Sequence, residues 1–561
     1  MSGISEERVD TVPFFACFGR GLLCETLTVD NFRDFLHYFL SYAFLMHKSL
    51  RGTIMEFIQN FFLALRPIVW DWPSWVILLG VGLILSIRTG FLQITKFTHF
   101  WDRTIIDMFR KPENRKSKST GKGDITPWQA INTAFCATMG VGTLAGTATA
   151  IAHGGPGAVF WMWVVGFFGI ATKFAEVSLS VHFRGFNKKG EVLSGPFAYM
   201  ERGIGFKPLA LFFAGAGAIA AFGIGNMVQS NSAATAIGHQ VSSILNVARG
   251  IGGTADALTP TSPEIIQIRL IVGIIVAVLI GLVVIGGLKR IAKVVEKIIP
   301  ALAITSIIAC FIIILSRIGN VPLAFGYIFR GAFAMESMVG GIYGAAIMYA
   351  IRFGLMRGIF SNEAGLGSAP IAYAAAKTDH PTKQGLWGAV EVFMDTHVMC
   401  TLVALAILVV VPLSDIGSAS LGLLTGSPLV IEAFARSLFG PVFGGWLMTI
   451  LIASFGFTTV IGWAFYGEKC FEYLFGLKPI LGYRLAMLPI CVFGAVGGIA
   501  AIWAIADTLN AFMALPNIVA LLILSGTVKK LMDDYFKNPD KIDYSFEKIS
   551  PEIANKEKAA G

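Results

Sequence analysis

The stretch AFCATMGVGTLAG, residues 134–146, is apolar and carries glycines placed two residues apart. It lies inside an apolar run over residues 127–151, which is long enough to cross a bilayer as a helix. Gly140 and Gly142 weaken that helix at its middle, so the backbone is predicted to unwind there, exposing carbonyls for a cation and amides for a carboxylate. Close packing of helices against small residues is the alternative explanation of the same glycines.

Further apolar runs of about 20 residues predict an all-α polytopic membrane protein with about 11 spans. The chain of 561 residues is 55% hydrophobic and 14% charged, with a mean hydropathy of +0.70. A water-soluble globular domain cannot present this composition to solvent. The expected spans lie near residues 73–94, 127–151, 157–181, 208–238, 267–287, 296–316, 322–351, 386–412, 441–466, 481–505 and 508–527.

The remaining composition argues against other classes of protein. The formal net charge of +9 falls in short clusters between apolar runs, which is typical of cytoplasmic loops and not of a nucleic-acid surface. The 7 cysteines are scattered without a C-x-x-C pair or metal-ligand spacing, so we expect no disulfide framework and no metal site other than one for sodium. The sequence contains neither H-E-x-x-H nor G-x-S-x-G, and no repeated pore motif, so we expect a transporter and not an enzyme. A channel or a non-transporting membrane subunit is a remote alternative.

Basic residues set the expected orientation. Eight lysines and arginines lie in residues 95–126, between the first two spans, and such loops stay in the cytoplasm. Alternation from there puts the N-terminus outside and the C-terminal tail inside. The predicted organisation is an N-terminal extension over residues 1–54 before a more natural start at Met55, a first transmembrane helix and basic loop over 55–126, two halves over 127–317 and 318–528, and a cytoplasmic tail over 529–561.

The two halves hold five expected spans each, and an odd number means that they insert with opposite orientations, as in inverted-repeat transporters. The first span of the second half also contains neighbouring glycines, Gly340 and Gly341, with the acidic Glu336 nearby. We therefore expect a second unwound segment there and a binding site between the two interruptions.

Two long blocks, GGPGAVFWMWVVGFFGIATKFAE (residues 154–176) and RGIFSNEAGLGSAPIAYAAAKT (residues 357–378), resemble signatures of the alanine or glycine:cation symporter family. Shorter blocks extend the resemblance over most of residues 60–530: GNMVQSNS (225–232), KRIAKVVEKIIP (289–300), QGLWGAVEVFMDT (384–396) and FTTVIGWAFYGEKC (457–470). The resemblance implies a leucine-transporter type five-plus-five inverted fold with one additional N-terminal helix. It also implies sodium-coupled uptake of a small neutral amino acid, alanine or glycine, across the inner membrane. A proton-coupled carrier of the same fold, using Glu336 or Asp395, is the alternative.

Candidate substrate ligands are the backbone of Gly140, Val141 and Gly142 together with polar side chains on two later spans. Asn226 and Gln229 are three residues apart, so they are expected on one helix face, where amides need either a ligand or an interhelical partner. The resemblance favours Gln229 as a substrate ligand.

Thr458, Thr459 and Trp463 lie in the ninth expected span, and Thr459 and Trp463 are one helical turn apart. The resemblance gives a threonine and a tryptophan at matching positions to the amino-acid pocket. Threonine hydroxyls are also suitable oxygen ligands for sodium, although bonding to the helix backbone is the common alternative. The predicted sodium site comprises these two hydroxyls and the carbonyls of Cys136 and Met139.

Intramembrane carboxylates form a further group of candidates, because charges in hydrocarbon are usually functional or paired. Asp395 and Glu391 are four residues apart in the eighth expected span, and a coupling or gating role is predicted mainly for Asp395 and Glu336. Lys173 and Glu176 are expected to form an internal ion pair. Where the family resemblance leads us to expect Gly-x-Gly-Asn, this chain has Thr143 after Gly142, which replaces an amide oxygen by a hydroxyl.

Overall fold

The computed structural model describes residues 54–69, 72–110, 121–249, 259, 262–333, 341–417, 423–540, 542 and 544–560. The chain divides into two units at Phe61 and Phe62. The described part of the first unit is the beginning of one helix, and all other described residues belong to the second. The predicted extension before Met55 lies outside the described residues, except for Ile54, and so does Glu336.

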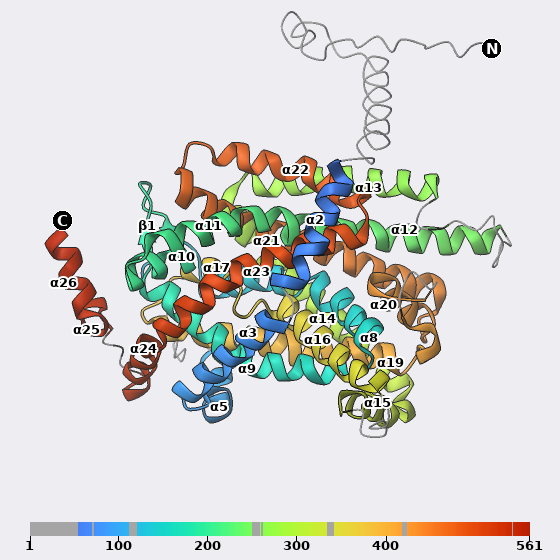
Figure 1. Ribbon diagram of the computed structural model, residues 1–561, viewed down its shortest axis with the longest axis horizontal. Coiled ribbons are helices and arrows are strands. Elements are labelled where there is room, and N and C mark those ends of the chain that lie inside the picture. The colour runs from blue at the N-terminus through green and yellow to red at the C-terminus, as the bar shows by residue number, and fades with distance from the viewer. Residues whose placement is uncertain are drawn as a thin grey trace, which may run out of the picture. The chain divides into compact units, whose positions relative to one another are not determined.

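The described chain is almost entirely helical (Figure 1). Its first half contains α2 (Ile54–Val69), α3 (Trp72–Arg88), α4 (Leu92–Thr95), α5 (Phe97–Arg103), α6 (Ile105–Met108), α7 (Pro127–Thr138), the π-helix η2 (Gly142–Gly146), α8 (Thr147–Gly154), α9 (Ala158–His182), α10 (Pro196–Ala198), the π-helix η3 (Tyr199–Ile204), α11 (Lys207–Phe222), the π-helix η4 (Gly223–Met227), α12 (Val228–Ala248), α13 (Pro263–Val284) and α14 (Gly287–Ser316). Between α9 and α10, β1 (Gly185–Phe186) and β2 (Val192–Leu193) form an antiparallel hairpin that pairs Gly185 with Leu193.

The second half contains the 3₁₀ turn η5 (Ile318–Asn320), α15 (Val321–Phe333), α16 (Gly341–Asn362), α17 (Pro370–Ala374), α18 (Pro381–Val392), the π-helix η6 (Phe393–Cys400), α19 (Thr401–Leu408), the 3₁₀ turn η7 (Leu413–Asp415), α20 (Gly426–Ala435), the π-helix η9 (Gly440–Gly444), α21 (Gly445–Phe475), α22 (Ile480–Val496) and α23 (Ile499–Ile523). The tail contains α24 (Ser525–Lys537), α25 (Phe546–Ile549) and α26 (Pro551–Ala560).

The membrane class predicted from composition is confirmed. Among the described residues, 7 helices are long and apolar enough to cross a bilayer, and the bent pair α7 and η2–α8 makes an eighth. Shorter apolar helices occur at Ser74–Arg88, Gly426–Ala435 and Ile480–Val496. The span expected over residues 322–351 contains α15, up to Phe333, and the beginning of α16, from Gly341, while residues 334–340 lie outside the described part of the chain.

Close helix packing depends on glycines at a few crossing points. α9 packs along both α16 and α18. A Cβ at Gly358 of α16 would overlap Val165 of α9, and a Cβ at Gly385 of α18 would overlap Ser178 of α9. The absence of side chains at these positions lets the backbones approach, as expected in a membrane where apolar burial does not drive association.

The tail contacts the ends of α9 and α18. His182, the last residue of α9, hydrogen-bonds Tyr544 and Ser550 through its two ring nitrogens, both at 2.8 Å. His380 precedes α18 and lies 3.4 Å from Asp534 Oδ2, while its Nδ1 accepts the Thr382 N–H at 3.0 Å. Burial lowers the pKa of His380 to about 4, with the Asp534 carboxylate opposing that shift. His380 is therefore neutral near pH 7 and caps α18 while it contacts the tail.

Candidate functional site: two interrupted helices facing α21

The first interruption lies where the glycine pair predicts it. α7 begins with a capping box between Thr126 and Gln129, which fixes its start, and ends at Thr138. Met139 has ψ 69°, outside the helical range, and the chain resumes as the π-helix η2 at Gly142. The two parts are bent by 42°. At the bend the Gly140 N–H donates to the Thr138 carbonyl at 2.8 Å, two residues back instead of four, so the regular helical pattern is broken there.

α21 lies directly against this interruption. A Cβ added at Gly140 would collide with the Thr459 hydroxyl, and one at Gly462 would collide with Cys136 Sγ. A Cβ at Gly456 would lie 3.6 Å from Val141. Because positions 456, 459 and 462 are three residues apart, they form one face of α21. The structure therefore brings the predicted substrate residues Gly140, Val141 and Thr459 together.

The interruption expected at Gly340 and Gly341 stays a prediction, and a second interruption that the sequence analysis did not predict lies further along the chain. Gly340 lies outside the described residues, and Gly341 begins α16, which continues to Asn362. The chain leaves the helical conformation over residues 363–369, where Glu363, Gly365 and Gly367 have φ of 55°, 90° and 79°. Positive φ is accessible mainly to glycine, so the pair at 365 and 367 permits the unwinding. Gly365 and Gly367 are two residues apart, as Gly140 and Gly142 are, and Pro370 follows them. This spacing in the sequence could have predicted the second interruption.

Glu363 is a residue of this interruption that sequence reasoning missed. Trp463 Nε1 donates to Glu363 Oε1 at 2.9 Å, and Ser368 Oγ donates to Oε2 at 2.5 Å. Both Glu363 and Trp463 are 1% exposed. Trp463 also covers Gly225 of η4, where a Cβ would collide with the indole. Trp463 thus connects α21 to the second interruption, one turn from the contact of Thr459 with the first.

The predicted sodium ligands gather near the first interruption but have local partners. The hydroxyls of Thr458 and Thr459 both donate to the Phe455 carbonyl, at 3.0 and 2.8 Å. Cys136 Sγ donates to the Thr133 carbonyl at 2.9 Å. Met139 is the C-cap of α7. In this conformation the threonines follow the backbone-bonding alternative.

Asp395 collects hydroxyls from three elements. Thr143 Oγ1 of η2 donates to Asp395 Oδ1 at 2.6 Å, and Ser361 Oγ of α16 donates to Oδ2 at 2.6 Å. Thr396, its neighbour on η6, donates to Oδ2 at 3.1 Å. All four side chains are 0–1% exposed. The threonine that stands in place of the expected asparagine therefore contacts a carboxylate, and this cluster of hard oxygen atoms suits a small cation.

Asn226 and Gln229 have separate partners. Asn226 Nδ2 donates to the Met487 carbonyl of α22 at 2.7 Å, whereas Gln229 Nε2 donates to the Ile224 carbonyl of η4 at 3.0 Å. The Oδ1 of Asn226 and the Oε1 of Gln229 are buried without a hydrogen-bond partner among the described residues. The backbone carbonyl of Gln229 approaches α21 at Gly456. Gln229 is thus close to the face of α21 that contacts the first interruption, while the Asn226 amide is directed to α22.

A layer of aromatic and charged groups covers the other side of the first interruption. A Cβ at Gly142 would lie 3.0 Å from the Phe360 ring, and that ring packs on Trp503 with centroids 4.8 Å apart. The Arg357 guanidinium lies 4.2 Å from the Trp503 ring centroid and 3.7 Å from Asp507 Oδ1. This layer joins α16 to α23 next to the interruption.

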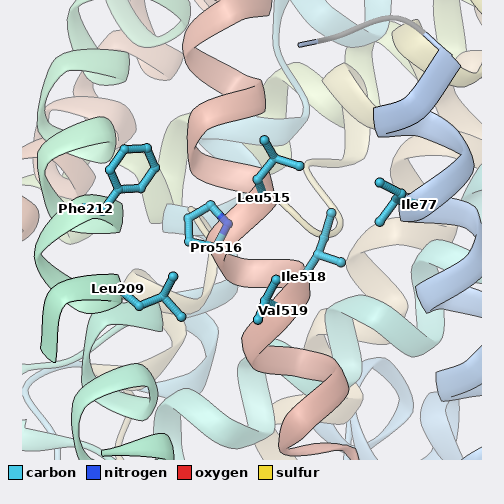
Figure 2. Close-up of a pocket in the computed structure, with 7 residues that line it drawn as sticks. All are labelled: Ile77, Leu209, Phe212, Leu515, Pro516, Ile518 and Val519. Atoms are coloured by element: carbon cyan, nitrogen blue, oxygen red, sulfur yellow. The ribbon is translucent and has the colours of Figure 1, made fainter. Parts of the chain in front are cut away.

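A groove of about 320 Å³ elsewhere in the structure does not fit an amino acid. It is lined by Ile77 of α3, Leu209 and Phe212 of α11, and Leu515, Pro516, Ile518 and Val519 of α23 (Figure 2). These side chains offer no group to pair with an ammonium or a carboxylate. The groove therefore does not compete with the interrupted helices as the candidate site.

The fold and site define a helical, multi-pass membrane protein whose polar centre is built from two interrupted helices and one continuous helix. Comparison with known proteins gives the family: residues 55–548 match the model of the sodium:alanine symporter family, and the chain belongs to it. The chain is 41% identical over 485 residues to the sodium/alanine symporter AgcS of Methanococcus maripaludis, which covers 85% of this chain and 98% of AgcS.

The names of two other relatives give a different substrate or coupling ion. The chain is 34% identical to the probable sodium/glutamine symporter GlnT of Bacillus subtilis, over 84% of this chain and 89% of GlnT. It is also 34% identical to YrbD of the same organism, a putative sodium/proton-dependent alanine carrier, over 85% of this chain and 92% of YrbD. A solved structure of MhsT with L-phenylalanine aligns with 76% of this chain at 16% identity and a TM-score of 0.49.

Proposed function

We propose that this protein is a sodium-coupled symporter that moves a small neutral amino acid, alanine or glycine, into the cell across the inner membrane by alternating access. The observation that carries the proposal is the position of α21, which contacts the first interruption through Thr459 and the second through Trp463. In the proposed topology the N-terminus is outside and the C-terminus is cytoplasmic.

The substrate site proposed here lies between Gly140, Val141 and Gly142 on one side and Gln229, Thr459 and Trp463 on the other. We expect backbone amides at the first interruption to bind the substrate carboxylate. The orphaned Gln229 Oε1 and the Glu363 carboxylate are acceptors suited to the ammonium. The tight contacts of Gly140 with Thr459 and of Gly142 with Phe360 leave little space, which supports a small side chain.

For the coupling cation we propose the hydroxyl cluster at Asp395 as the main site. A carboxylate with the Thr143, Ser361 and Thr396 hydroxyls supplies hard oxygen ligands and a negative charge in one place. The hydroxyls now donate to Asp395, and each has lone pairs that can turn to a cation. The carbonyls of Cys136 and Met139 with Thr458 and Thr459 remain a second candidate, because they flank the same interruption.

Uptake of radiolabelled alanine into proteoliposomes tests the proposal directly. We expect accumulation driven by an inward sodium gradient, and none when choline replaces sodium. Competition by unlabelled glycine, glutamine and larger amino acids measures selectivity, with glycine expected to compete best. Accumulation in choline driven by a pH gradient alone would favour the proton-coupled alternative instead.

A further inference from the structure

Lys173, Glu176, Glu363 and Glu391 form a buried charge cluster where α9, α18 and the second interruption meet. The Lys173 and Glu391 side chains are fully buried, as is that of Glu176, and Glu363 is 1% exposed. Lys173 Nζ lies 3.8 Å from Glu176 Oε1 and 3.9 Å from Glu391 Oε1. One ammonium thus accompanies three carboxylates. The cluster is larger than the simple ion pair of Lys173 with Glu176 that the sequence predicts.

Hydrogen-bond donors are divided unequally among the three carboxylates. Glu176 Oε2 accepts from Asn517 Nδ2 at 2.9 Å and its Oε1 accepts from the Gly365 N–H at 3.4 Å. Glu363 accepts from Trp463 and Ser368. Within the described part of the chain, neither Glu391 oxygen and no Lys173 Nζ proton forms a hydrogen bond of good geometry, although the Tyr373 and Thr138 hydroxyls interact with the Glu391 carboxylate. Donors stabilise a carboxylate's charge, so Glu176 and Glu363 are the members arranged to be ionised.

Ionised Glu391 would be a fully buried carboxylate with only the Tyr373 and Thr138 hydroxyls as neutral partners, in a cluster already negative by one charge. Such a state is costly unless the group takes a proton or a cation. We propose that Glu391 binds an exchangeable proton and that this proton competes with the coupling cation at Asp395. The inference rests on the proposed function, because it uses the cation site assigned there.

The surroundings of Glu391 suit a group that changes its protonation state. The buried Tyr373 hydroxyl of α17 interacts with the Glu391 carboxylate, and it can donate to a carboxylate or accept from a carboxylic acid. When Glu391 releases its proton, the Lys173 ammonium 3.9 Å away becomes its counter-ion. The titratable groups facing Glu391 are Lys173 and Glu176 on α9, Cys136 on α7, Glu363 in the second interruption, Tyr373 on α17, Tyr466 on α21 and Asp395 on its own continuous helix.

Competition follows from the spacing of the two sites. Glu391 and Asp395 are four residues apart, about 6 Å along the helix axis. A proton on Glu391 removes a negative charge next to the cation site, and a cation at Asp395 favours ionised Glu391. Because binding linkage is reciprocal, sodium should expel the proton, and acid should weaken sodium. We expect about a tenfold weaker sodium affinity at pH 5.5 than at pH 8, a size typical of charges at this separation.

Proton release measures this linkage without a membrane gradient. Sodium chloride is added to the purified full-length protein in weakly buffered detergent at pH 6.5 with a pH-indicator dye, and choline chloride is the blank. The parent should release protons in a saturable way. Glu391→Gln, which imitates the protonated acid, should release none, and its sodium affinity should be the same from pH 5.5 to pH 8. Glu432→Gln, on α20 and paired with Arg436, is the matched control and should behave as the parent.

The outcomes separate the two proposals. A parent protein that binds sodium without proton release and with the same affinity at every pH overturns the proton site, and this measurement needs no variant. Undiminished release by Glu391→Gln also overturns it, because the proton would then be elsewhere. Alanine uptake that never needs sodium is a different result, and it would overturn the proposed function first.

Discussion

Trp463 Nε1 and Glu363 Oε1 lie 2.9 Å apart and join α21 to the second interruption. One turn earlier on the same helix, Thr459 lies against Gly140 of the first interruption. α21 therefore contacts both irregular segments through neighbouring side chains, and a change in either segment reaches the other through a continuous helix.

Replacement of Trp463 by phenylalanine removes the indole donor but keeps a large ring against Gly225. Glu363 Oε1 then loses its Trp463 hydrogen bond, at a cost of about 1.5–3 kcal/mol for a bond to a charged group. We expect Trp463→Phe to raise the KM for alanine roughly tenfold or more. Initial rates in proteoliposomes measure the effect, with Trp161→Phe on α9 as the control. Parent kinetics for Trp463→Phe would remove this residue from the site.

Gly140→Ala should abolish most uptake, because the added methyl occupies the position of the Thr459 hydroxyl. Gly146→Ala is the matched control: it lies in the same interrupted helix, and a Cβ there meets nothing within 4 Å. We expect alanine uptake below about a tenth of the parent for the first variant and near the parent for the second. Equal uptake by the two variants, at equal amounts in the membrane, would contradict the contact of α21 with the first interruption.

Three substitutions distinguish the candidate cation sites. Asp395→Asn keeps the shape of the side chain and removes its charge, so the sodium concentration for half-maximal uptake should rise at least tenfold. Thr458→Val and Thr459→Val each remove a hydroxyl that donates to the Phe455 carbonyl, and each should raise this sodium concentration about threefold or less. Sodium titrations of alanine uptake give the values. If the threonine variants weaken sodium dependence more than Asp395→Asn does, the cation site is the one formed by Cys136, Met139 and the two threonines.

Acidification should loosen the tail from the end of α18. The folded-state pKa of His380 is lowered to about 4 from an ordinary value of 6.5, so the neutral ring stabilises the fold. That contribution is complete above pH 6.5 and is lost as pH falls through about 4, because the unfolded or released state binds the proton more readily. Limited proteolysis within residues 525–560 should accelerate over this range. His380→Asn keeps a helix-capping side chain and should flatten the pH dependence; an unchanged profile would place the titrating group elsewhere.

The sequence by itself determined the membrane class, the interruption at Gly140 and Gly142, and the shared face of Thr459 and Trp463. These features depend on properties of short segments: the length of an apolar run, the low helix propensity of glycine and the turn of 3.6 residues. The spacing of Gly365 and Gly367 is also a property of a short segment, so the second interruption was predictable from it. The break expected at Gly340 and Gly341 lies at the edge of the described residues and stays a prediction.

Only the tertiary structure decided which side chains surround each carboxylate. Thr143 and Asp395 are 252 residues apart in the sequence, and Lys173 and Glu391 meet only because α9 packs along α18. A buried carboxylate looks the same in the sequence whether it accepts well-formed hydrogen bonds, as Glu176 and Glu363 do, or forms none of good geometry, as Glu391 does. The difference depends on packing between distant helices, because in a low-dielectric interior the neighbours of a charged group replace water in setting its energy.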